Sequence, residues 1–130
     1  MNLRANFTPR HSAANAVAFN TASYLFDVYE DANNYIRAYW SAANTLTLAF
    51  NANGGGEQTN TWNATGLWDA AATKLVQLKT TATKAELYVD ETLRITVTAA
   101  CVFATGFTNA PNWGSRQDGT LQFDGTIAAP

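Results

Sequence analysis

Apolar and polar residues alternate along most of this chain, and a period of two is typical of a β-strand with one buried face. The alternation is clearest in three segments separated by short runs of Ala and Asn, namely 24–31, 35–40 and 45–50. Further strand-like segments are 59–68, 73–81, 84–89, 92–98 and 119–128. No segment of useful length carries the helical period. About eight or nine strands predict an all-β chain, folded as an antiparallel two-sheet β-sandwich.

The register of the first three strands can be tested, because residues paired across a sheet must share a face. A three-residue loop between the first two strands sets Val28 opposite Ala38, and a five-residue loop before the third sets Trp40 opposite Leu46. With these loops the apolar positions of all three strands coincide on one face. The pattern therefore predicts a meander whose buried residues, with Trp68 from a later segment, are Phe26, Val28, Ile36, Ala38, Trp40, Leu46, Leu48 and Phe50.

The stretch KAELYVDETLRITV, residues 84–97, has the pattern of a hairpin. A three-residue turn at 90–92 keeps the apolar faces of its two strands aligned. A two-residue Asp-Glu turn would break that alignment, and Glu tolerates a positive φ poorly. We therefore predict the three-residue turn, with these side chains directed inward: Leu87, Val89, Leu93, Ile95 and Val97.

Composition narrows the function classes. The chain has 130 residues, the size of a single domain spanning 1–130, and only 14% of them are charged, below the usual quarter. Net charge is −2 and Lys and Arg form no cluster, so we expect no nucleic-acid partner. No apolar run reaches the roughly 20 residues that span a bilayer, so we expect no membrane insertion. The low charge favours an extracellular or particle-borne protein.

Residues with catalytic potential are few. The only histidine, His11, lies in a polar segment and is expected to be a solvated loop residue, and the single Cys101 is expected to be a buried, inert thiol. In the acidic run 27–31 the two Asp side chains share a face, whereas Glu30 points to the other. A glycosidase needs two carboxylates flanking its substrate, and no second acidic pair lies nearby. We predict that the chain is not an enzyme.

The outward side of the meander is the strongest candidate for a binding site. The register sets Tyr29 opposite Arg37, and the whole patch comprises Asp27, Tyr29, Tyr35, Arg37 and Tyr39. Aromatic rings stack on the C–H faces of sugars, and carboxylate and guanidinium groups bond to sugar hydroxyls, so the patch has the chemistry of a glycan site. Tyrosines are also favoured as cross-strand pairs on a solvated sheet, and that interpretation stays open. Two tryptophans in loop-like segments are secondary candidates: Trp62 and Trp113.

Several short motifs occur in a recognisable order: Trp68, then Leu87-Tyr88-Val89-Asp90, then Gly114-Ser115, then Phe123-Asp124-Gly125-Thr126-Ile127. This order resembles the concanavalin A-like lectin/glucanase superfamily, and its LamG-like jelly-roll domains in particular, over about residues 18–127. Glu91 stands where the family usually has Gly. The chain stops at 128–130, where relatives usually continue with one more strand that pairs near the amino terminus. Either the domain is a minimal version of the family, or its sheet edges are open and filled by another chain. Because unprotected edges invite pairing, we expect a homo-oligomer formed through open edges.

The resemblance implies a jelly-roll sandwich and a non-catalytic carbohydrate-binding or adhesion module, displayed outside the cell or on a particle such as a phage fibre. The alternative is a purely structural or oligomerising domain of a virion or surface protein, and a glucan-cleaving hydrolase ranks third. LamG-like domains also often hold calcium through loop oxygens, which Ca²⁺ prefers. The same kinds of residue are typical turn formers. Such oxygens are available here on Asp31, Asn33, Asn34, Asp69, Asp118 and Asp124.

Overall fold

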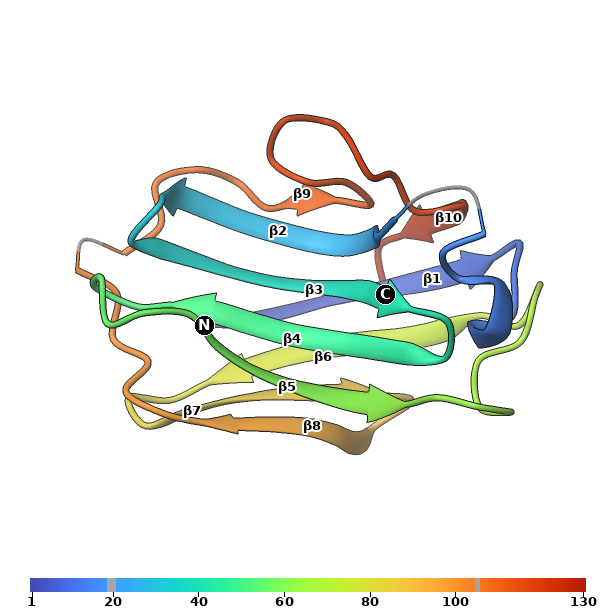
Figure 1. Ribbon diagram of the computed structural model, residues 1–130, viewed down its shortest axis with the longest axis horizontal. Helices are drawn as coiled ribbons and strands as arrows, with labels where there is room; N and C mark the ends of the chain where they lie inside the picture. Colours follow the sequence, from blue (N-terminus) through green and yellow to red (C-terminus); the bar gives the residue numbers. More distant parts are fainter. Residues whose placement is uncertain (19–20, 105) are drawn as a thin grey trace.

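The computed structural model describes residues 1–18, 21–104 and 106–130, and within these ranges ten strands form two antiparallel sheets of five strands each. Sheet A has the strand order β10 (Gly125–Ala128), β1 (Asn2–Pro9), β6 (Lys74–Thr80), β7 (Lys84–Val89) and β8 (Thr92–Thr98). Sheet B has the order β5 (Gln58–Asn63), β4 (Thr45–Asn51), β3 (Asn34–Ala42), β2 (Ser23–Asp31) and β9 (Asn112–Trp113). The two sheets face one another (Figure 1), so the predicted β-sandwich is confirmed.

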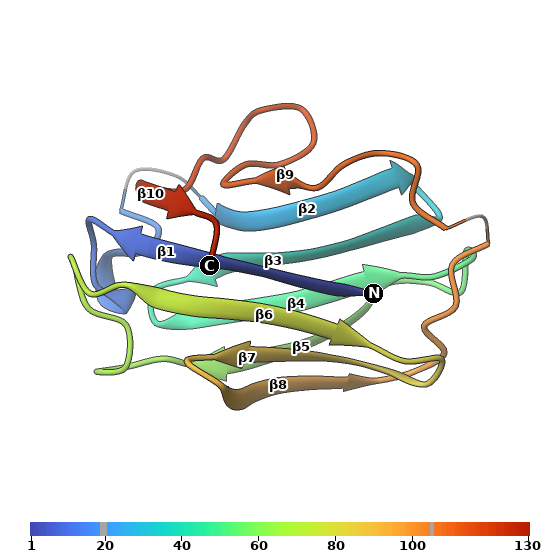
Figure 2. The same cartoon turned by 180° about the vertical axis from the view of Figure 1, so that it is seen from behind.

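The core fills the space between the sheets and is built from the alternating apolar positions. In sheet B every residue predicted to point inward is buried, from Phe26 on β2 to Phe50 on β4. Trp40 and Trp68 are both fully buried and meet at 5.3 Å between ring centroids. Figure 2 shows sheet A in front, and its central strands supply the other half of the core. Burial of each large apolar side chain stabilises the fold by about 1.5–3 kcal/mol, which is why the alternation decides which face of each strand is inside.

The register between β2 and β3 differs from the predicted one by two residues. Val28 pairs with Ile36 and Phe26 with Ala38, because the turn contains only two residues and a bulge near its start absorbs the difference. The Asp31 carboxylate accepts a hydrogen bond from the Asn33 backbone N–H at 2.8 Å and so favours this tight turn. A shift of two residues leaves each side chain on its predicted face. The predicted pairing of Trp40 with Leu46 across β3 and β4 is confirmed.

The hairpin between β7 and β8 turns in two residues rather than three. Asp90 and Glu91 have φ values of 51° and 66°, and Val89 pairs with Thr92. A bulge on β8 then restores the inward face further along, but it turns Leu93 outward, where it is 44% exposed. The predictions of a three-residue turn and of an inward Leu93 were wrong.

The physical reason lies outside the hairpin. The Asp90 carboxylate accepts a hydrogen bond from the Leu75 backbone N–H at 2.9 Å, and the Asp90 N–H donates to the Leu75 carbonyl at 2.8 Å. Lys74 also forms an ion pair with Asp90 at 3.3 Å. These contacts with β6 hold the turn and outweigh the poor intrinsic tolerance of Glu for a positive φ.

The last strand, β10, pairs with the first strand, β1, at one edge of sheet A. β1 was not among the predicted strands, because its polar residues obscure the alternation of the buried Ala5 and Phe7. Two glycines allow the close approach here. A Cβ on Gly125 would lie 2.4 Å from the Thr8 carbonyl oxygen, and one on Gly114 would lie 2.7 Å from a methyl group of Ile127. Both glycines belong to the short motifs recognised in the sequence.

His11 is buried, so the prediction of a solvated loop histidine was wrong. It follows β1 directly, and its ring packs edge-on against Trp40 and Phe123, with centroids 6.5 Å and 5.7 Å away. Its Nδ1 lies 3.0 Å from the Ser12 carbonyl oxygen. Cys101 is buried as predicted, and burial raises the pKa of its thiol, which makes it a poor nucleophile at neutral pH.

Candidate functional site

Three cross-strand pairs of β2 and β3 lie on the outward face of sheet B. They are Tyr24 with Tyr39, Asp27 with Arg37, and Tyr29 with Tyr35. We call these six residues the tyrosine–arginine face. It contains all five residues of the predicted meander patch, although the predicted pairings Tyr29–Arg37 and Asp27–Tyr39 were wrong because of the two-residue shift.

Tyr24 is the member that the alternation did not predict. Counting by twos from Phe26 places Tyr24 inside, but the pairing of β2 with β3 has an irregularity between these two residues. Leu25 takes the extra position and is buried in the core, and Tyr24 turns outward. A β-bulge of this kind re-aims side chains without a clear sequence signal.

The rings of the face are packed around one guanidinium group. Tyr24 and Tyr39 stack with centroids 4.9 Å apart and an interplanar angle of 13°, and Tyr29 and Tyr35 stack at 6.2 Å and 18°. The Arg37 guanidinium carbon lies 3.9 Å from the Tyr35 centroid and 6.0 Å from those of Tyr24 and Tyr29. Arg37 therefore occupies the middle of the face and makes a close cation–π contact with Tyr35.

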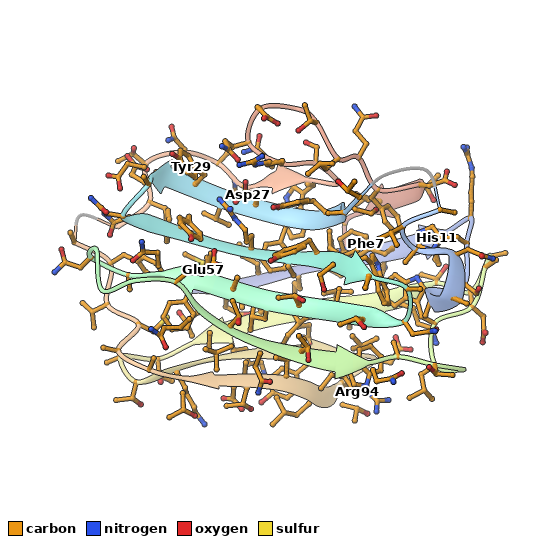
Figure 3. All side chains as sticks on the ribbon, in the orientation of Figure 1. Phe7, His11, Asp27, Tyr29, Glu57 and Arg94 are labelled. Atoms are coloured by element: carbon orange, nitrogen blue, oxygen red, sulfur yellow. The ribbon has the colours of Figure 1, made fainter. Side chains whose placement is uncertain are left out.

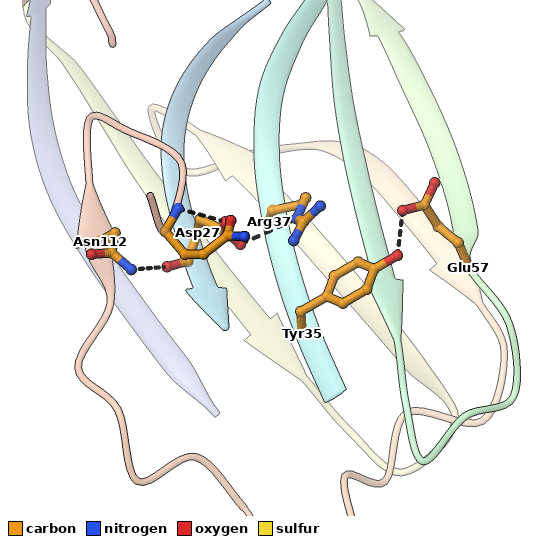
Figure 4. Close-up of polar contacts among 6 residues, drawn as sticks. Asp27, Tyr35, Arg37, Glu57 and Asn112 are labelled. Carbon is orange, nitrogen blue, oxygen red and sulfur yellow. Dashed lines mark hydrogen bonds and ion pairs between the residues drawn. The ribbon is translucent and has the colours of Figure 1, made fainter. Parts of the chain in front are cut away.

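Asp27 fixes Arg37 from below. Its carboxylate accepts a hydrogen bond from Arg37 Nε at 3.1 Å and another from the Gln117 backbone N–H at 3.0 Å (Figure 4). Asn112 on β9 donates to the Asp27 carbonyl at 3.3 Å. Asp27 has no exposed surface and Arg37 only 9%. Burial raises the pKa of the Asp27 carboxyl, although the charge of Arg37 and the Gln117 N–H act in the opposite direction.

The five predicted residues lie on the outward side of the meander as expected, but they do not form a solvated sheet surface. Tyr29 and Tyr39 are half-buried, but Asp27 lies beneath Arg37 and the segment that follows β9. Gln117, which belongs to this segment, is ninety residues further along the sequence than Asp27. The result is a supported polar cluster rather than a solvated surface pair.

Glu57 is a further member of the site that the sequence did not indicate. It lies in the Gly-rich loop before β5, and Tyr35 Oη donates a hydrogen bond to its carboxylate at 2.5 Å (Figure 4). Burial, then this hydrogen bond and the negative charge of Glu57, raise the pKa of Tyr35 to about 12. Burial and the charge of Glu57 also raise the pKa of Tyr39. Glu57 itself is exposed, so its carboxylate remains accessible to a ligand.

Several polar atoms on or beside the face have no protein partner. Within residues 1–18, 21–104 and 106–130, the Nη atoms of Arg37 form no hydrogen bond or ion pair. Arg116 Nε and Gln117 Oε1 are buried and also lack hydrogen-bond partners in that part of the chain. The face thus combines aromatic surface with the free Nη donors of Arg37, a combination that suits a ligand rich in hydroxyl groups.

The carboxylates of the run 27–31 are engaged separately rather than paired for catalysis. Asp27 is bound to Arg37, and Asp31 accepts from Asn33 in the β2–β3 turn. Glu30 accepts hydrogen bonds from the Thr108 hydroxyl and backbone N–H, at 2.6 Å and 2.9 Å, and these lower its pKa. The run therefore presents no pair of free carboxylates across a common substrate position.

Most of the candidate calcium ligands are engaged in hydrogen bonds or an ion pair. Across the described ranges, no group of three or more His, Cys, Asp or Glu side chains comes together. Asp118 accepts from the Thr120 N–H and hydroxyl, which lowers its pKa, and Asp124 forms an ion pair with Arg10 at 3.6 Å. Asn34 Oδ1 accepts from the Asn53 and Ala104 backbone N–H groups. These residues shape turns and connect loops.

The two tryptophan candidates lie away from the tyrosine–arginine face. Trp62 is on β5 and packs against the core, with the Arg94 guanidinium carbon 4.9 Å from its ring. Figure 3 shows Arg94 on the opposite side of the sandwich from Asp27 and Tyr29. Trp113 is 36% exposed and contacts the Phe7 and Phe26 rings. It also lines a cavity of about 420 Å³ beside the β1–β10 edge.

No protein-family model matches the sequence, and no curated protein matches it significantly. Solved structures do match its fold. The CBM40 of Ruminococcus gnavus IT-sialidase, bound to α2,3-sialyllactose, has a TM-score of 0.65 at 15% identity, with 98% of this chain and 71% of that chain covered. Domains LG4-5 of the mouse laminin α1 chain give 0.66 at 14%, covering 98% and 33%. The carbohydrate-binding module CBM66 from Bacillus subtilis gives 0.54 at 16%, covering 98% and 74%.

The fold is therefore the concanavalin A-like jelly-roll sandwich that the motif order resembled. Its structural neighbours include carbohydrate-binding modules and laminin LG domains, and a β-glucanase from Bacillus licheniformis has a TM-score of 0.52 at 17% identity, with 98% of this chain and 61% of that chain covered. Among the described residues no helix is long and apolar enough to cross a membrane.

Proposed function

We propose that this protein is a non-catalytic glycan-binding module whose ligand lies on the tyrosine–arginine face. The observation that carries the proposal is the fixed position of Arg37. Asp27 and Tyr35 hold its guanidinium group in place and its Nη atoms remain free, while the accessible carboxylate of Glu57 lies at the Tyr35 hydroxyl. The presence of carbohydrate-binding modules among the structural neighbours supports the same function class.

The chemistry of the face suits a sugar. Half-buried Tyr29 and Tyr39 offer aromatic surface to C–H groups, Arg37 donates to hydroxyl oxygens, and Glu57 accepts from hydroxyl groups. Because Asp27 holds Arg37 before a ligand arrives, little side-chain freedom is lost on binding. The face is an open sheet surface, so we expect modest affinity that several copies on one particle would strengthen.

A glycan array tests the assignment. Wild-type protein should give hits that Tyr39→Ala loses, because this substitution removes exposed ring surface from the face. Tyr88→Ala is the matched control, since Tyr88 lies on the outward face of sheet A. A blank array for the wild type, or equal hits for wild type and Tyr39→Ala, would refute the site. Release of reducing sugar from a glucan panel would instead indicate an enzyme.

We also propose that the module is displayed outside the cell or on a virus particle such as a phage fibre. The support is its low content of charged residues, 14%, with solubility resting on uncharged polar side chains. Antibody labelling of intact cells or purified particles from the source should detect the protein. Signal only after lysis of cells and particles would contradict this location.

A purely structural or oligomerising domain is the second candidate function, and one observation favours it. The tyrosines stack on one another in cross-strand pairs, which would stabilise the sheet without any ligand. Self-association through the edge strands β5, β8, β9 and β10 stays a prediction. Light scattering at several concentrations tests it, and a monomer at every concentration would contradict it.

A further inference from the structure

We propose that the ligand of the tyrosine–arginine face is an uncharged, hydroxyl-rich glycan rather than an acidic one. This inference rests on the glycan-binding function proposed above and adds the substrate class. It follows from the distribution of charge on and around the face, taken residue by residue.

The central cation is already neutralised. Arg37 and Asp27 form an ion pair at 3.1 Å, and the Asp27 carboxylate is completely buried against the guanidinium group. An anionic sugar approaching Arg37 therefore meets a neutral pair rather than a free positive charge. The free Nη atoms are available to donate hydrogen bonds to a ligand, and hydroxyl oxygens are suitable acceptors for them.

The second cation near the face is also offset. Arg116 lies in the segment that covers Asp27, and its charge lowers the pKa of both Asp27 and Asp118. Asp118 is exposed and stands two residues further along the same segment. Arg116 forms no ion pair within the described ranges, but the opposite charge of Asp118 beside it leaves the two residues together with no net charge.

The charge that remains on the face is negative. Glu57 is exposed, accepts a hydrogen bond from Tyr35, and has no basic partner within 1–18, 21–104 and 106–130. Its negative charge acts most strongly at Tyr35 and Tyr39, where it raises the pKa by more than the charge of Arg37 lowers it, whereas at Tyr24 the charges of Arg37 and Arg116 each act more strongly than Glu57. A carboxylate or sulfate on a sugar would be repelled there, whereas a hydroxyl group would donate to Glu57.

Polar groups of the neighbouring strands extend this hydroxyl-compatible surface. Thr47 pairs with Tyr39 across β3 and β4, and its hydroxyl lies 2.7 Å from that of Ser41. Thr61 on β5 pairs with Thr47 in turn. Thr47 is buried, so the uncharged hydroxyl groups that are exposed beside it are those of Ser41 and Thr61.

The experiment compares neutral glycans with their acidic counterparts. An array carrying neutral oligosaccharides beside their sialylated and sulfated forms is probed with wild type, Tyr39→Ala and Glu57→Lys, and each hit is then titrated by calorimetry, including lactose against α2,3-sialyllactose. We expect wild type to prefer the neutral form by about tenfold at low salt. Glu57→Lys should reduce this preference at least about threefold, because it replaces the repelling charge by an attracting one.

Glu91→Lys is the matched control, since Glu91 is exposed on the β7–β8 turn of sheet A and contributes to none of the tyrosine shifts of the face. It should leave the preference unchanged. Tight binding of an acidic glycan that Tyr39→Ala abolishes would overturn the substrate class and leave the proposed function intact. Absence of any glycan binding, or binding that Tyr39→Ala leaves unchanged, would overturn the proposed function and this inference with it.

Discussion

The outward faces of the two sheets carry the same kinds of residue but hold them differently. On sheet A, Lys79 lies over the Tyr88 ring at 4.6 Å, and Tyr88 donates to Glu86 at 3.3 Å. These are partly exposed groups on flexible stems. On sheet B the corresponding trio of cation, tyrosine and carboxylate is Arg37, Tyr35 and Asp27, and the carboxylate is buried.

The difference comes from a distant part of the chain rather than from the strands themselves. The segment after β9 brings the Gln117 N–H onto Asp27, so the carboxylate has two strong donors and no exposed surface. Arg37 also differs from Lys79 because its planar fork can be held at Nε while its Nη atoms stay free. A surface pair thereby becomes a pre-organised group, which is the property a binding site requires.

The largest expected effect comes from breaking the buried pair on sheet B. Asp27→Ala leaves Arg37 nearly buried without its partner, and we expect a loss of about 3 kcal/mol in the free energy of unfolding. Glu86→Ala on sheet A removes a partly exposed carboxylate and should cost less than about 1 kcal/mol. Urea denaturation followed by tryptophan fluorescence measures both. Equal losses for the two variants would show that the faces do not differ in this way.

Replacing both charges separates stability from binding. The double variant Asp27→Leu with Arg37→Met removes the ion pair and fills its space with apolar groups, so its stability should stay within about 1.5 kcal/mol of wild type. Glycan binding should nevertheless disappear, because the donors of Arg37 are lost. Retained binding in a folded double variant would remove Arg37 from the site.

Acid titration should reveal the buried carboxylate. Burial raises the pKa of Asp27, so the folded protein binds this proton more tightly than the unfolded chain does. The resulting stabilisation is complete below the unfolded pKa near 3.8 and is lost as pH rises through the raised folded value. The free energy of unfolding of wild type should therefore fall relative to that of Asp27→Asn over this range.

Asp118→Asn supplies a control of opposite sign. Hydrogen bonds from Thr120 lower the pKa of Asp118 in the folded protein, so its contribution is present above the unfolded pKa and is lost as pH falls through the lowered value. Wild type should gain stability relative to Asp118→Asn as pH rises. Urea titrations at a series of pH values measure both differences, and the same sign for the two variants would contradict the assignment.

The smallest expected effect is a change in stability at alkaline pH. The pKa of Tyr35 is raised to about 12, so the stability that its neutral form contributes is lost as pH rises from its unfolded value of 10.0 through about 12. Glu57→Gln should lower the pKa of Tyr35 but leave it above 10.0, because burial remains the main cause. Tyrosinate absorbance measures the change, with Tyr35→Phe identifying the signal. An unchanged titration in Glu57→Gln would remove Glu57 from the face.

Much of the fold and part of the site could be predicted from alternation alone. It placed Phe26, Ala38 and Leu48 inside and Tyr29 and Arg37 outside, and each lies on the predicted face. That prediction survived a register error of two residues, because a shift by an even number preserves the face. Alternation could not show that Tyr24 faces outward, because a bulge between Tyr24 and Phe26 changes which positions of β2 face the core.

The order of residues thus specified which side chains face the core, because the burial of apolar surface acts at every second position. Only the tertiary structure decided which polar residues meet. Gln117 reaches Asp27 and Glu57 reaches Tyr35 across loops whose paths depend on the packed sheets, and His11 is buried for the same reason. The outward position of the tyrosines could be predicted from the sequence. The support that distant residues give to the site could not, because contacts between residues distant in sequence leave no local pattern.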